Sequence, residues 1–376
     1  MCIFLFFSPL CLGAQANWLE DYAANIQTQA AKYNVPGYIF VFVEKGGDAR
    51  VISYGKTARG GPVIAANTVF RLASVSKTLT SMLTAKLVKQ HKMNWQTSIS
   101  TLAPEFGFNQ AGVAELSLQH LIGQSSGYMP NSYDNLIEAN YPLKRVLNKL
   151  ADLQPLCAPG QCYTYQNALF GVLEHYFHSQ NSSYQRELTR EIIQPLAMNN
   201  ASVGKAALMS APSWAKPHVA IDKRKWLDVA VENNYYKFGP AAGVNASIAD
   251  MTIWLRAMLG EYPKVVSPDL IATVTEPRVK TIREVNRRGW SRFLNDAHYG
   301  LGWRVYDFDG HKLNYHGGWV KGYRADIAFA PEQNVGYAML MNAESNLINQ
   351  FTAEFWHSYF VQAKKKQQAK LAVVSD

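Results

Sequence analysis

Strand-like patterns at both ends of this 376-residue chain enclose a long middle segment with helical patterns. Apolar and aromatic residues alternate from Gly37 to Tyr54 around a Lys45-Gly46-Gly47-Asp48 turn, which predicts a β-hairpin. Strand patterns return late in the chain, at residues 299–306, 313–315, 323–330 and 335–341. This distribution predicts an α+β fold. Both ends of the chain should build one antiparallel sheet flanked by helices, with an inserted all-helical domain between them.

The same patterns predict the division of the chain. The sheet domain is expected in residues 17–80 and 240–362, the helical domain in 81–239, and a basic tail in 363–376. A first helix is expected to start near Ser74, because apolar residues recur after it at spacings of three and four. A closing helix is expected over Asn349–Phe360.

Residues 1–16 differ from the rest of the chain. The segment from Cys2 to Leu12 is apolar and uncharged, and Ala14-Gln15-Ala16 supplies the small residues of a cleavage site. We therefore expect a signal peptide cleaved after Ala16 and a periplasmic or secreted protein, with a buried N-terminal strand as the alternative. No later run reaches the roughly 20 apolar residues of a membrane helix, so no membrane span is expected.

Cys157 and Cys162 remain after that segment and flank a Pro-Gly turn. A disulfide closing this turn fits an oxidising compartment, and a pair of reduced thiols is the alternative. The two cysteines lack partners at zinc spacing, and His175 and His178 lack a His-Glu-x-x-His pattern, so no metal site is expected. The sequence contains no phosphate loop or Gly-x-Gly-x-x-Gly motif, and catalysis is expected to need no cofactor.

The formal net charge is +9, and much of the excess lies in two short runs. Lys223-Arg224-Lys225 and the lysines of the tail (Lys364, Lys365, Lys366 and Lys370) are interpreted as solvated faces. Nucleic-acid binding would need a basic stripe with stacking aromatics or a known module, which the sequence lacks. For an exported protein of this charge, we expect attraction to an anionic cell envelope and not to DNA.

The sequence Ser74-Val75-Ser76-Lys77 places a hydroxyl and an amine three residues apart, so a helical turn brings both to one face. The pKa of an ammonium falls beside cationic or apolar groups, and the neutral amine can then take the serine proton. Free N–H groups at the start of the helix favour a developing oxyanion. The pair alone also fits a solvated lysine beside an N-capping serine.

Tyr165 and Asn167 are two residues apart, so in an extended loop their side chains face the same side. The phenol can relay protons, and the amide can hold a substrate carbonyl or fix Lys77. The alternative is that Tyr165 is a packed aromatic residue beside a loop amide, Asn167, with neither taking part in catalysis.

His316, Gly317 and Gly318 follow the strand predicted at residues 313–315. Glycines there let a ligand backbone approach a strand edge, and His316 would supply a donor near the leaving group. The alternative is a turn with a surface histidine.

These three motifs, in this order, resemble those of the serine penicillin-recognising enzymes, in the branch of class C β-lactamases, D-alanyl-D-alanine carboxypeptidases and related esterases. That family carries Ser-x-x-Lys, then Tyr-x-Asn, then Lys-Thr-Gly or His-x-Gly. Here Ser74, Tyr165 and His316 follow at separations of 91 and 151 positions. The resemblance covers about residues 20–360 and includes the segments 70–73, 116–127, 240–247 and 299–303. It implies a β-lactamase/transpeptidase-like fold.

The resemblance implies a role for each matching residue. Ser74 would be the acylated nucleophile, Lys77 its base, Tyr165 the proton relay and Asn167 a substrate-amide ligand. Gly317, Gly318 and Trp319 would line the substrate site, and the oxyanion hole would use the backbone N–H groups of Ser74 and Trp319. The Trp319 ring would narrow the cleft or offer stacking. His316 replaces a permanently charged lysine, so carboxylate-bearing β-lactams are expected to be held less well.

The sequence thus predicts an exported serine hydrolase that forms an acyl-enzyme at Ser74. The expected substrate is a small molecule or a peptidoglycan peptide. Strict β-lactamase, D-alanyl-peptidase and broad esterase activities all fit the same catalytic residues. A non-hydrolytic penicillin-binding homologue is the alternative of another class, and it is disfavoured because Ser74 and Lys77 are both present.

Overall fold

The computed structural model describes residues 13–108 and 115–374. Cys2, Cys11 and most of the predicted signal peptide lie outside the described residues, whereas Ala16, the predicted cleavage point, falls within helix α1 (Gly13–Lys32). None of the described helices combines the length and the apolar character that crossing a bilayer would require.

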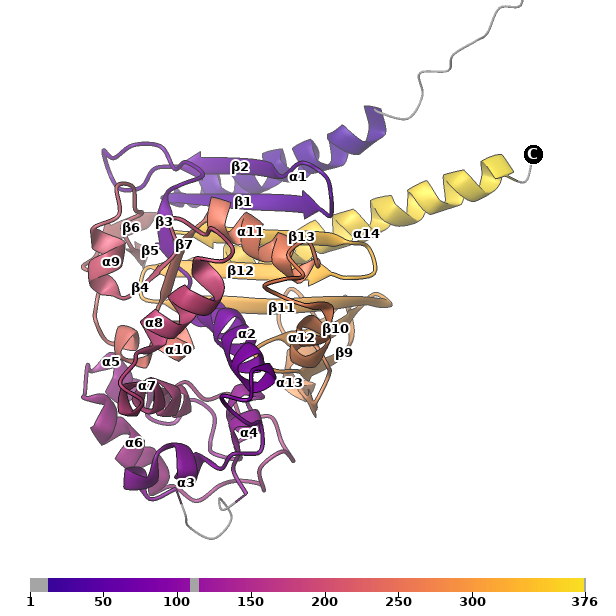
Figure 1. Ribbon diagram of the computed structural model, residues 1–376. Coiled ribbons are helices and arrows are strands. Elements are labelled where there is room, and N and C mark those ends of the chain that lie inside the picture. The colour runs from indigo at the N-terminus through magenta and orange to yellow at the C-terminus, as the bar shows by residue number, and fades with distance from the viewer. Residues whose placement is uncertain (1–12, 109–114, 375–376) are drawn as a thin grey trace, which may run out of the picture.

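One eight-stranded antiparallel sheet forms the centre of the molecule (Figure 1). Its strand order is β2-β1-β13-β12-β11-β10-β9-β8, so the N-terminal hairpin pairs with the last strand of the chain. The strands are β1 (Gly37–Glu44), β2 (Arg50–Gly55), β8 (Val279–Lys280), β9 (Leu294–Tyr299), β10 (Arg304–Phe308), β11 (His311–Val320), β12 (Tyr323–Ala330) and β13 (Val335–Met341). The predicted sheet, built from both ends of the chain, is confirmed.

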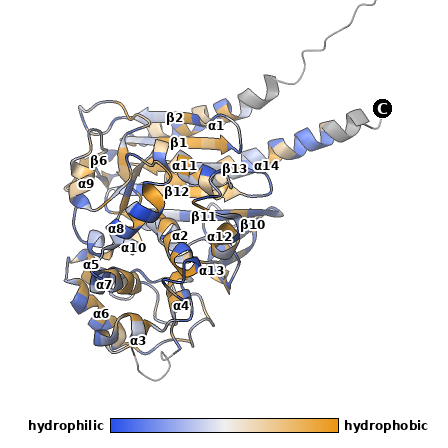
Figure 2. Cartoon of the chain, in the orientation of Figure 1, coloured by the Kyte–Doolittle hydropathy of each residue, from blue (hydrophilic) through white to orange (hydrophobic). Residues whose placement is uncertain are grey.

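Helices cover both faces of this sheet. On one face α1 and α14 (Leu347–Val374) pack an aromatic cluster against the strands, and the Tyr22 and Tyr337 hydroxyls are hydrogen-bonded at 2.9 Å. On the other face lie α2 (Ser76–Lys89), α11 (Ile248–Met258) and α12 (Pro268–Val274). Every residue of β13 is buried, which explains its unbroken apolar sequence (Figure 2).

The middle of the chain is mostly helical, and most of it lies below the sheet in Figure 1, whereas residues 202–228 lie beside the sheet. It contains α3 (Ile99–Leu102), α4 (Leu118–Ile122), α5 (Asp134–Glu138), α6 (Leu143–Ala151), α7 (Gly171–Ser179), α8 (Tyr184–Leu188), α9 (Lys205–Met209), the 3₁₀ turns η2 (Pro104–Phe106), η3 (Ala168–Phe170) and η5 (Tyr235–Phe238), and the π-helical turn η4 (Thr189–Ile193). The segment predicted to be all helical also holds three short strands, β4 (Ser202–Val203), β5 (His218–Asp222) and β6 (Lys225–Asp228).

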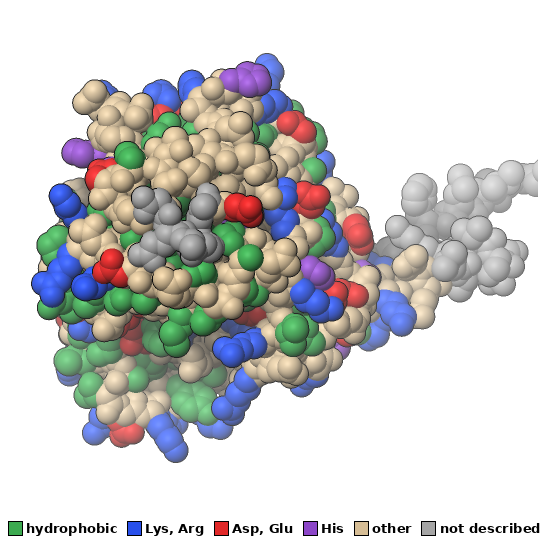
Figure 3. Space-filling model, turned by 90° about the horizontal axis from the view of Figure 1, so that it is seen from below, with side chains coloured by type: hydrophobic (Ala, Val, Ile, Leu, Met, Phe, Trp, Pro, Cys, Tyr) green, Lys and Arg blue, Asp and Glu red, His purple; other side chains and the backbone are tan. Residues whose placement is uncertain are grey.

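The last two of these strands form a hairpin whose tip carries Lys223, Arg224 and Lys225, all exposed as predicted. Lys364, Lys365 and Lys366 are exposed as well. On the face drawn in Figure 3, Lys and Arg side chains are scattered among acidic and apolar ones.

Three predicted elements have different bounds in the structure. Residues 299–306 are not one strand, because Gly302, with φ of +73°, lies in a turn between β9 and β10. Strand β11 continues five residues past Tyr315, since pairing with β12 holds Gly317 and Gly318 in extended conformation. Helix α14 continues to Val374, so the described part of the basic tail belongs to the helix, in keeping with the high helix propensity of lysine and glutamine.

Candidate active site

A strained backbone turn presents Ser74. Strand β3 (Val69–Arg71) pairs with β7 (Val244–Ser247), and the 3₁₀ turn η1 (Ala73–Val75) then leads into α2. Ala73 has a φ of +49°, a region that is sterically unfavourable for residues with a Cβ. The neighbouring Leu72 N–H donates to the carbonyl of Val244 at 2.9 Å, which anchors this turn. The α-helix itself begins at Ser76, two residues later than predicted.

Lys77 lies one turn further on and is fully buried. Its Nζ donates to Ser74 Oγ at 3.3 Å, to Asn167 Oδ1 at 2.7 Å and to the carbonyl oxygen of Ala241, in α10 (Gly239–Ala242), at 3.0 Å. Burial lowers the pKa of Lys77, although the nearby Tyr165 and Asp134 oppose this shift. The predicted contact between amine and hydroxyl is therefore present, with an amine that is easier to deprotonate than a free lysine.

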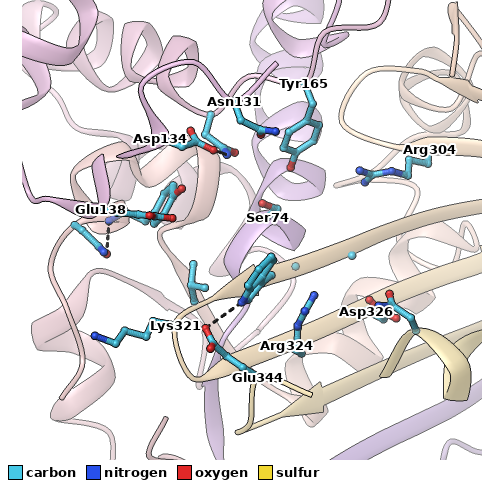
Figure 4. Close-up of a pocket in the computed structure, with 18 of the residues that line it drawn as sticks. Ser74, Asn131, Asp134, Glu138, Tyr165, Arg304, Lys321, Arg324, Asp326 and Glu344 are labelled. Carbon is cyan, nitrogen blue, oxygen red and sulfur yellow. Dashed lines mark hydrogen bonds between the residues drawn. The ribbon is translucent and has the colours of Figure 1, made fainter. Parts of the chain in front are cut away.

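Tyr165 and Asn167 face Lys77 from the loop that precedes η3. The ring centre of Tyr165 is 4.9 Å from Lys77 Nζ, and Figure 4 shows its hydroxyl directed toward Ser74. Asn167 binds Lys77 through Oδ1, and its Nδ2 donates to Asp134 Oδ2 at 2.8 Å. Of the two roles considered for the amide, the structure thus shows the one that fixes Lys77.

The placement of His316 corrects one expectation. The residue is fully buried, and it is not one of the residues that line the pocket in front of Ser74. Its Nε2 lies 3.0 Å from the Tyr299 hydroxyl and 3.5 Å from Arg304 Nη1, and its Nδ1 lies 2.9 Å from the carbonyl oxygen of Gly317. Both ring nitrogens therefore have partners inside the protein. The imidazole contacts Tyr299, Arg304 and Gly317 and does not reach into the pocket where a leaving group would lie.

Burial, together with the charges of Arg304 and Lys77, holds the pKa of His316 well below its usual range. The imidazole is consequently neutral at physiological pH. The permanent positive charge next to it belongs to Arg304, which does line the pocket and whose guanidinium is 5.4 Å from the ring centre of Tyr165.

Strand β11 offers a free edge beside Ser74. The pairing of β10 with β11 ends at Arg304 and Tyr315, whereas β12 pairs with β11 as far as Val320. A Cβ on Gly318 would lie 2.3 Å from the Leu72 carbonyl oxygen and 3.2 Å from the Ser74 nitrogen, so only glycine allows this approach. A free strand edge next to a nucleophile suits an extended substrate backbone.

Trp319 stands at the rim of this edge with 60% of its surface exposed. Its Nε1 donates to Glu344 Oε1 at 3.0 Å, and the Arg324 guanidinium lies 4.3 Å from its ring centre. The expected oxyanion hole of the Ser74 and Trp319 N–H groups stays a prediction, which the close approach of Gly318 to Ser74 supports.

A pocket of about 680 Å³ opens in front of Ser74, and charged side chains of both signs line it (Figure 4). Asp134 and Glu138 lie on one side of Ser74, and Arg304, Arg324 and Asp326 lie on the other. Burial raises the pKa of Asp134 to about 6, although Asn167 and Lys77 oppose the shift. The side with the two arginines also carries carboxylates, since Glu284 Oε1 lies 3.4 Å from Arg304 Nε.

The predicted disulfide is formed between Cys157 and Cys162. Its loop bonds to the segment that follows α4, where Gly160 N donates to the Ser125 carbonyl oxygen at 2.7 Å. Tyr163 follows the bridge directly, so the disulfide holds the start of the loop that carries Tyr165. Among residues 13–108 and 115–374, no group of three or more His, Cys, Asp or Glu side chains is arranged to hold a metal ion.

Sequence reasoning missed Asp134, Arg304 and the positive φ of Ala73. Asp134 belongs to no motif and reaches the site only through the fold. Arg304 directly follows the segment 299–303, which resembles the family. Its position next to that segment could have indicated that Arg304 belongs to the site.

The fold and the side chains around Ser74 define the class of serine β-lactamases and transpeptidases. The family model described as Beta-lactamase matches residues 22–354, and the chain belongs to this family. The resemblance stated from the three motifs is therefore confirmed.

Two curated relatives are similar over most of the chain. "Unguisins hydrolase ungD'" of Aspergillus campestris is 21% identical over 355 residues, which cover 90% of this chain and 64% of that protein. "Protein flp" of Staphylococcus aureus is 24% identical over 336 residues, which cover 86% and 63%. The chain thus spans slightly less than two thirds of the length of these relatives.

Two solved structures show the same fold. The octameric penicillin-binding protein homologue from Pyrococcus abyssi aligns with a TM-score of 0.77 at 20% identity, covering 87% of this chain and 74% of that one. The class C beta lactamase from Rhodobacter sphaeroides aligns with a TM-score of 0.73 at 18% identity, covering 89% and 97%.

Proposed function

We propose that this protein is a serine hydrolase that forms an acyl-enzyme at Ser74 and cleaves an amide bond next to a carboxylate. The observation that carries the proposal is the contact of Ser74 Oγ with the buried, fixed amine of Lys77 at the floor of an open pocket. The similarity to a relative named as a hydrolase supports hydrolysis over simple binding.

The chemistry follows from the positions of the side chains. Neutral Lys77 takes the proton of Ser74 Oγ while Oγ bonds to the substrate carbonyl carbon. Tyr165 passes a proton to the leaving nitrogen as the C–N bond breaks, which leaves an ester on Ser74. A water molecule, deprotonated through the same groups, then attacks the ester, and the Ser74 hydroxyl is restored.

The two arginines that line the pocket, Arg304 and Arg324, favour substrates that carry a carboxylate on the leaving side. His316 is neutral, but Arg304 beside it and Arg324 further along the pocket carry permanent charge, that of Arg304 being shared with Glu284 at 3.4 Å. This modifies the expectation that carboxylate-bearing substrates are held poorly. A D-alanyl peptide and a β-lactam both have the required carboxylate, whereas a simple ester does not.

The test compares kcat/KM for a D-alanyl-D-alanine peptide, a chromogenic cephalosporin and a short acyl ester. Ser74→Ala should abolish hydrolysis of all three and the acyl adduct seen by mass spectrometry. An adduct or turnover that survives in Ser74→Ala would refute the proposal.

Arg304→Gln separates the carboxylate hypothesis from general damage. Loss of one charge-assisted contact should lower kcat/KM for the two carboxylate substrates by about 10- to 100-fold. Ester hydrolysis, which needs no such contact, should change far less. Arg186→Gln, on the exposed side of α8, removes the same charge away from the pocket and should leave all three substrates unaffected. Equal losses for all three substrates in Arg304→Gln would contradict the assignment.

We also propose that the protein acts in an oxidising compartment outside the cytoplasm. The Cys157–Cys162 disulfide supports this location, because such bridges are rare in reducing compartments. Mass spectrometry of the protein from its native source should find two hydrogens fewer than in the reduced chain, and free thiols throughout would contradict the proposal.

A further inference from the structure

A continuous line of hydrogen bonds runs from Asp134 to the nucleophile. Asp134 Oδ2 accepts from Asn167 Nδ2 at 2.8 Å, Asn167 Oδ1 accepts from Lys77 Nζ at 2.7 Å, and Lys77 Nζ reaches Ser74 Oγ at 3.3 Å. These four residues come from α5, the loop before η3, and the η1–α2 turn. The line therefore joins segments that are far apart in the sequence.

The orientation of the Asn167 amide decides whether this line can form. An amide has an accepting end and a donating end, and an ammonium or amine of lysine needs the accepting end. If the amide were turned over, its NH₂ group would face the Lys77 amine. An ionised carboxylate accepts hydrogen bonds only, so Asp134 selects the orientation in which the amide oxygen points to Lys77.

The charges around both groups are mixed. Tyr165, Arg304 and His316 face Lys77 from the loop and from strands β10 and β11, in addition to Asp134. Glu138 and Tyr235 face Asp134 from α5 and η5. Of these groups, Asp134 is the carboxylate that favours the protonated form of Lys77.

We propose that Asp134 is a positioning residue for the reaction at Ser74, which orients the Asn167 amide so that its oxygen holds Lys77. The inference rests on the proposed function of that site. It assigns Asp134 no contact with the reacting atoms, and its effect passes through Asn167 and Lys77.

Two variants separate the geometric effect of Asp134 from the effect of its charge. Asp134→Ala removes the acceptor for Asn167, and kcat/KM per titrated active site should fall by about 10- to 100-fold, as expected when a charge-assisted hydrogen bond is lost. Asp134→Asn keeps an accepting oxygen of the same shape, so the loss at the optimum pH should be smaller.

The pH dependence distinguishes positioning from a general structural role. In Asp134→Asn the loss of negative charge lowers the pKa of Lys77 further, so the amine stays neutral to lower pH. The acid limb of kcat/KM should therefore move to lower pH in this variant. Asp152→Asn makes the same chemical change at the exposed end of α6, where Asp152 pairs with Lys149 at the surface, and should leave both the limb and the optimum unchanged.

Two outcomes would overturn the proposal. One is a pH profile of kcat/KM in both Asp134 variants whose acid limb and optimum match those of the wild type. The other is a loss of activity that is equal at every pH and is fully explained by a smaller fraction of folded active sites. That result would indicate that Asp134 has a purely structural role.

A measurement that needs no turnover keeps the inference separate from the proposed function. The Cε resonance of ¹³C-labelled Lys77, identified by its absence in Lys77→Arg, should titrate at lower pH in Asp134→Asn than in the wild type. An unchanged titration would overturn the role of Asp134 at Lys77. A wild-type protein with no Ser74-dependent hydrolysis would refute the proposed function, and this titration would still decide the role of Asp134.

Discussion

Replacing Gly318 with alanine tests whether the approach of strand β11 to Ser74 is needed for activity. The new Cβ would lie 2.3 Å from the Leu72 carbonyl oxygen and 3.2 Å from the Ser74 nitrogen, and both of these are backbone atoms that cannot rotate away. The strand must therefore move away from the η1 turn by about 1 Å, a misplacement of the size that costs on the order of 100-fold in rate. The overpacking should also lower the free energy of unfolding by about 1–3 kcal/mol.

The assay measures kcat/KM per active site, titrated with a covalent probe, and the urea midpoint of unfolding. Gly47→Ala is the matched control, because its Cβ would meet only Glu44 atoms at 3.5 Å and its stability should change by about 0.5 kcal/mol or less. If Gly318→Ala kept both the wild-type kcat/KM and the wild-type midpoint, the reasoning that this strand must lie against Ser74 would be refuted.

Four further predictions concern the proton relay Tyr165, the base Lys77, the neutral His316 and the disulfide. Tyr165→Phe should slow deacylation by about 100-fold and acylation less, which gives a larger burst followed by a slower steady state; an unchanged steady-state rate would count against the relay. Because burial lowers the pKa of Lys77, kcat/KM should fall only when the pH drops through that lowered pKa, and Lys77→Arg, which is always protonated, should be inactive. Since the pKa of His316 is also low, this residue should cause no change in kcat/KM near pH 6.5. A pH-dependent change in kcat/KM near pH 6.5 that disappears in His316→Gln would contradict the prediction. Replacing Cys157 and Cys162 with serine should lower the free energy of unfolding by about 2 kcal/mol in denaturant titrations. An unchanged free energy of unfolding would contradict the conclusion that the disulfide stabilises the loop before Tyr165.

The sheet was largely predictable because its strands have strong local patterns. The ranges predicted for β12 and β13 agree with the structure, and the hairpin turn at residues 45–48 was found from its glycines and aspartate. The end of β11 was predicted too early, because Gly317 and Gly318 have low strand propensity and only their pairing with β12 keeps them extended. Local propensity cannot report such tertiary pairing.

The candidate site was predictable where its residues form motifs. The Ser74–Lys77 contact follows from helical spacing, and the side-by-side placement of Tyr165 and Asn167 follows from loop spacing. The positions of Asp134 and Arg304 in the site depend instead on how the helical segment and β10 pack around the pocket, which no short motif records. The burial of His316 likewise depends on which face of β11 it occupies, which the short motif does not reveal.

The pairing of β1 with β13 has a consequence for biosynthesis. While the ribosome is still making the middle of the chain, the inner edge of β1 has no partner, since residues 335–341 are translated some 300 positions later. An apolar strand with an open edge invites association with other nascent chains. We therefore expect that versions of the protein truncated before Val335 aggregate, and that the complete chain depends on holdase chaperones until its last strand emerges.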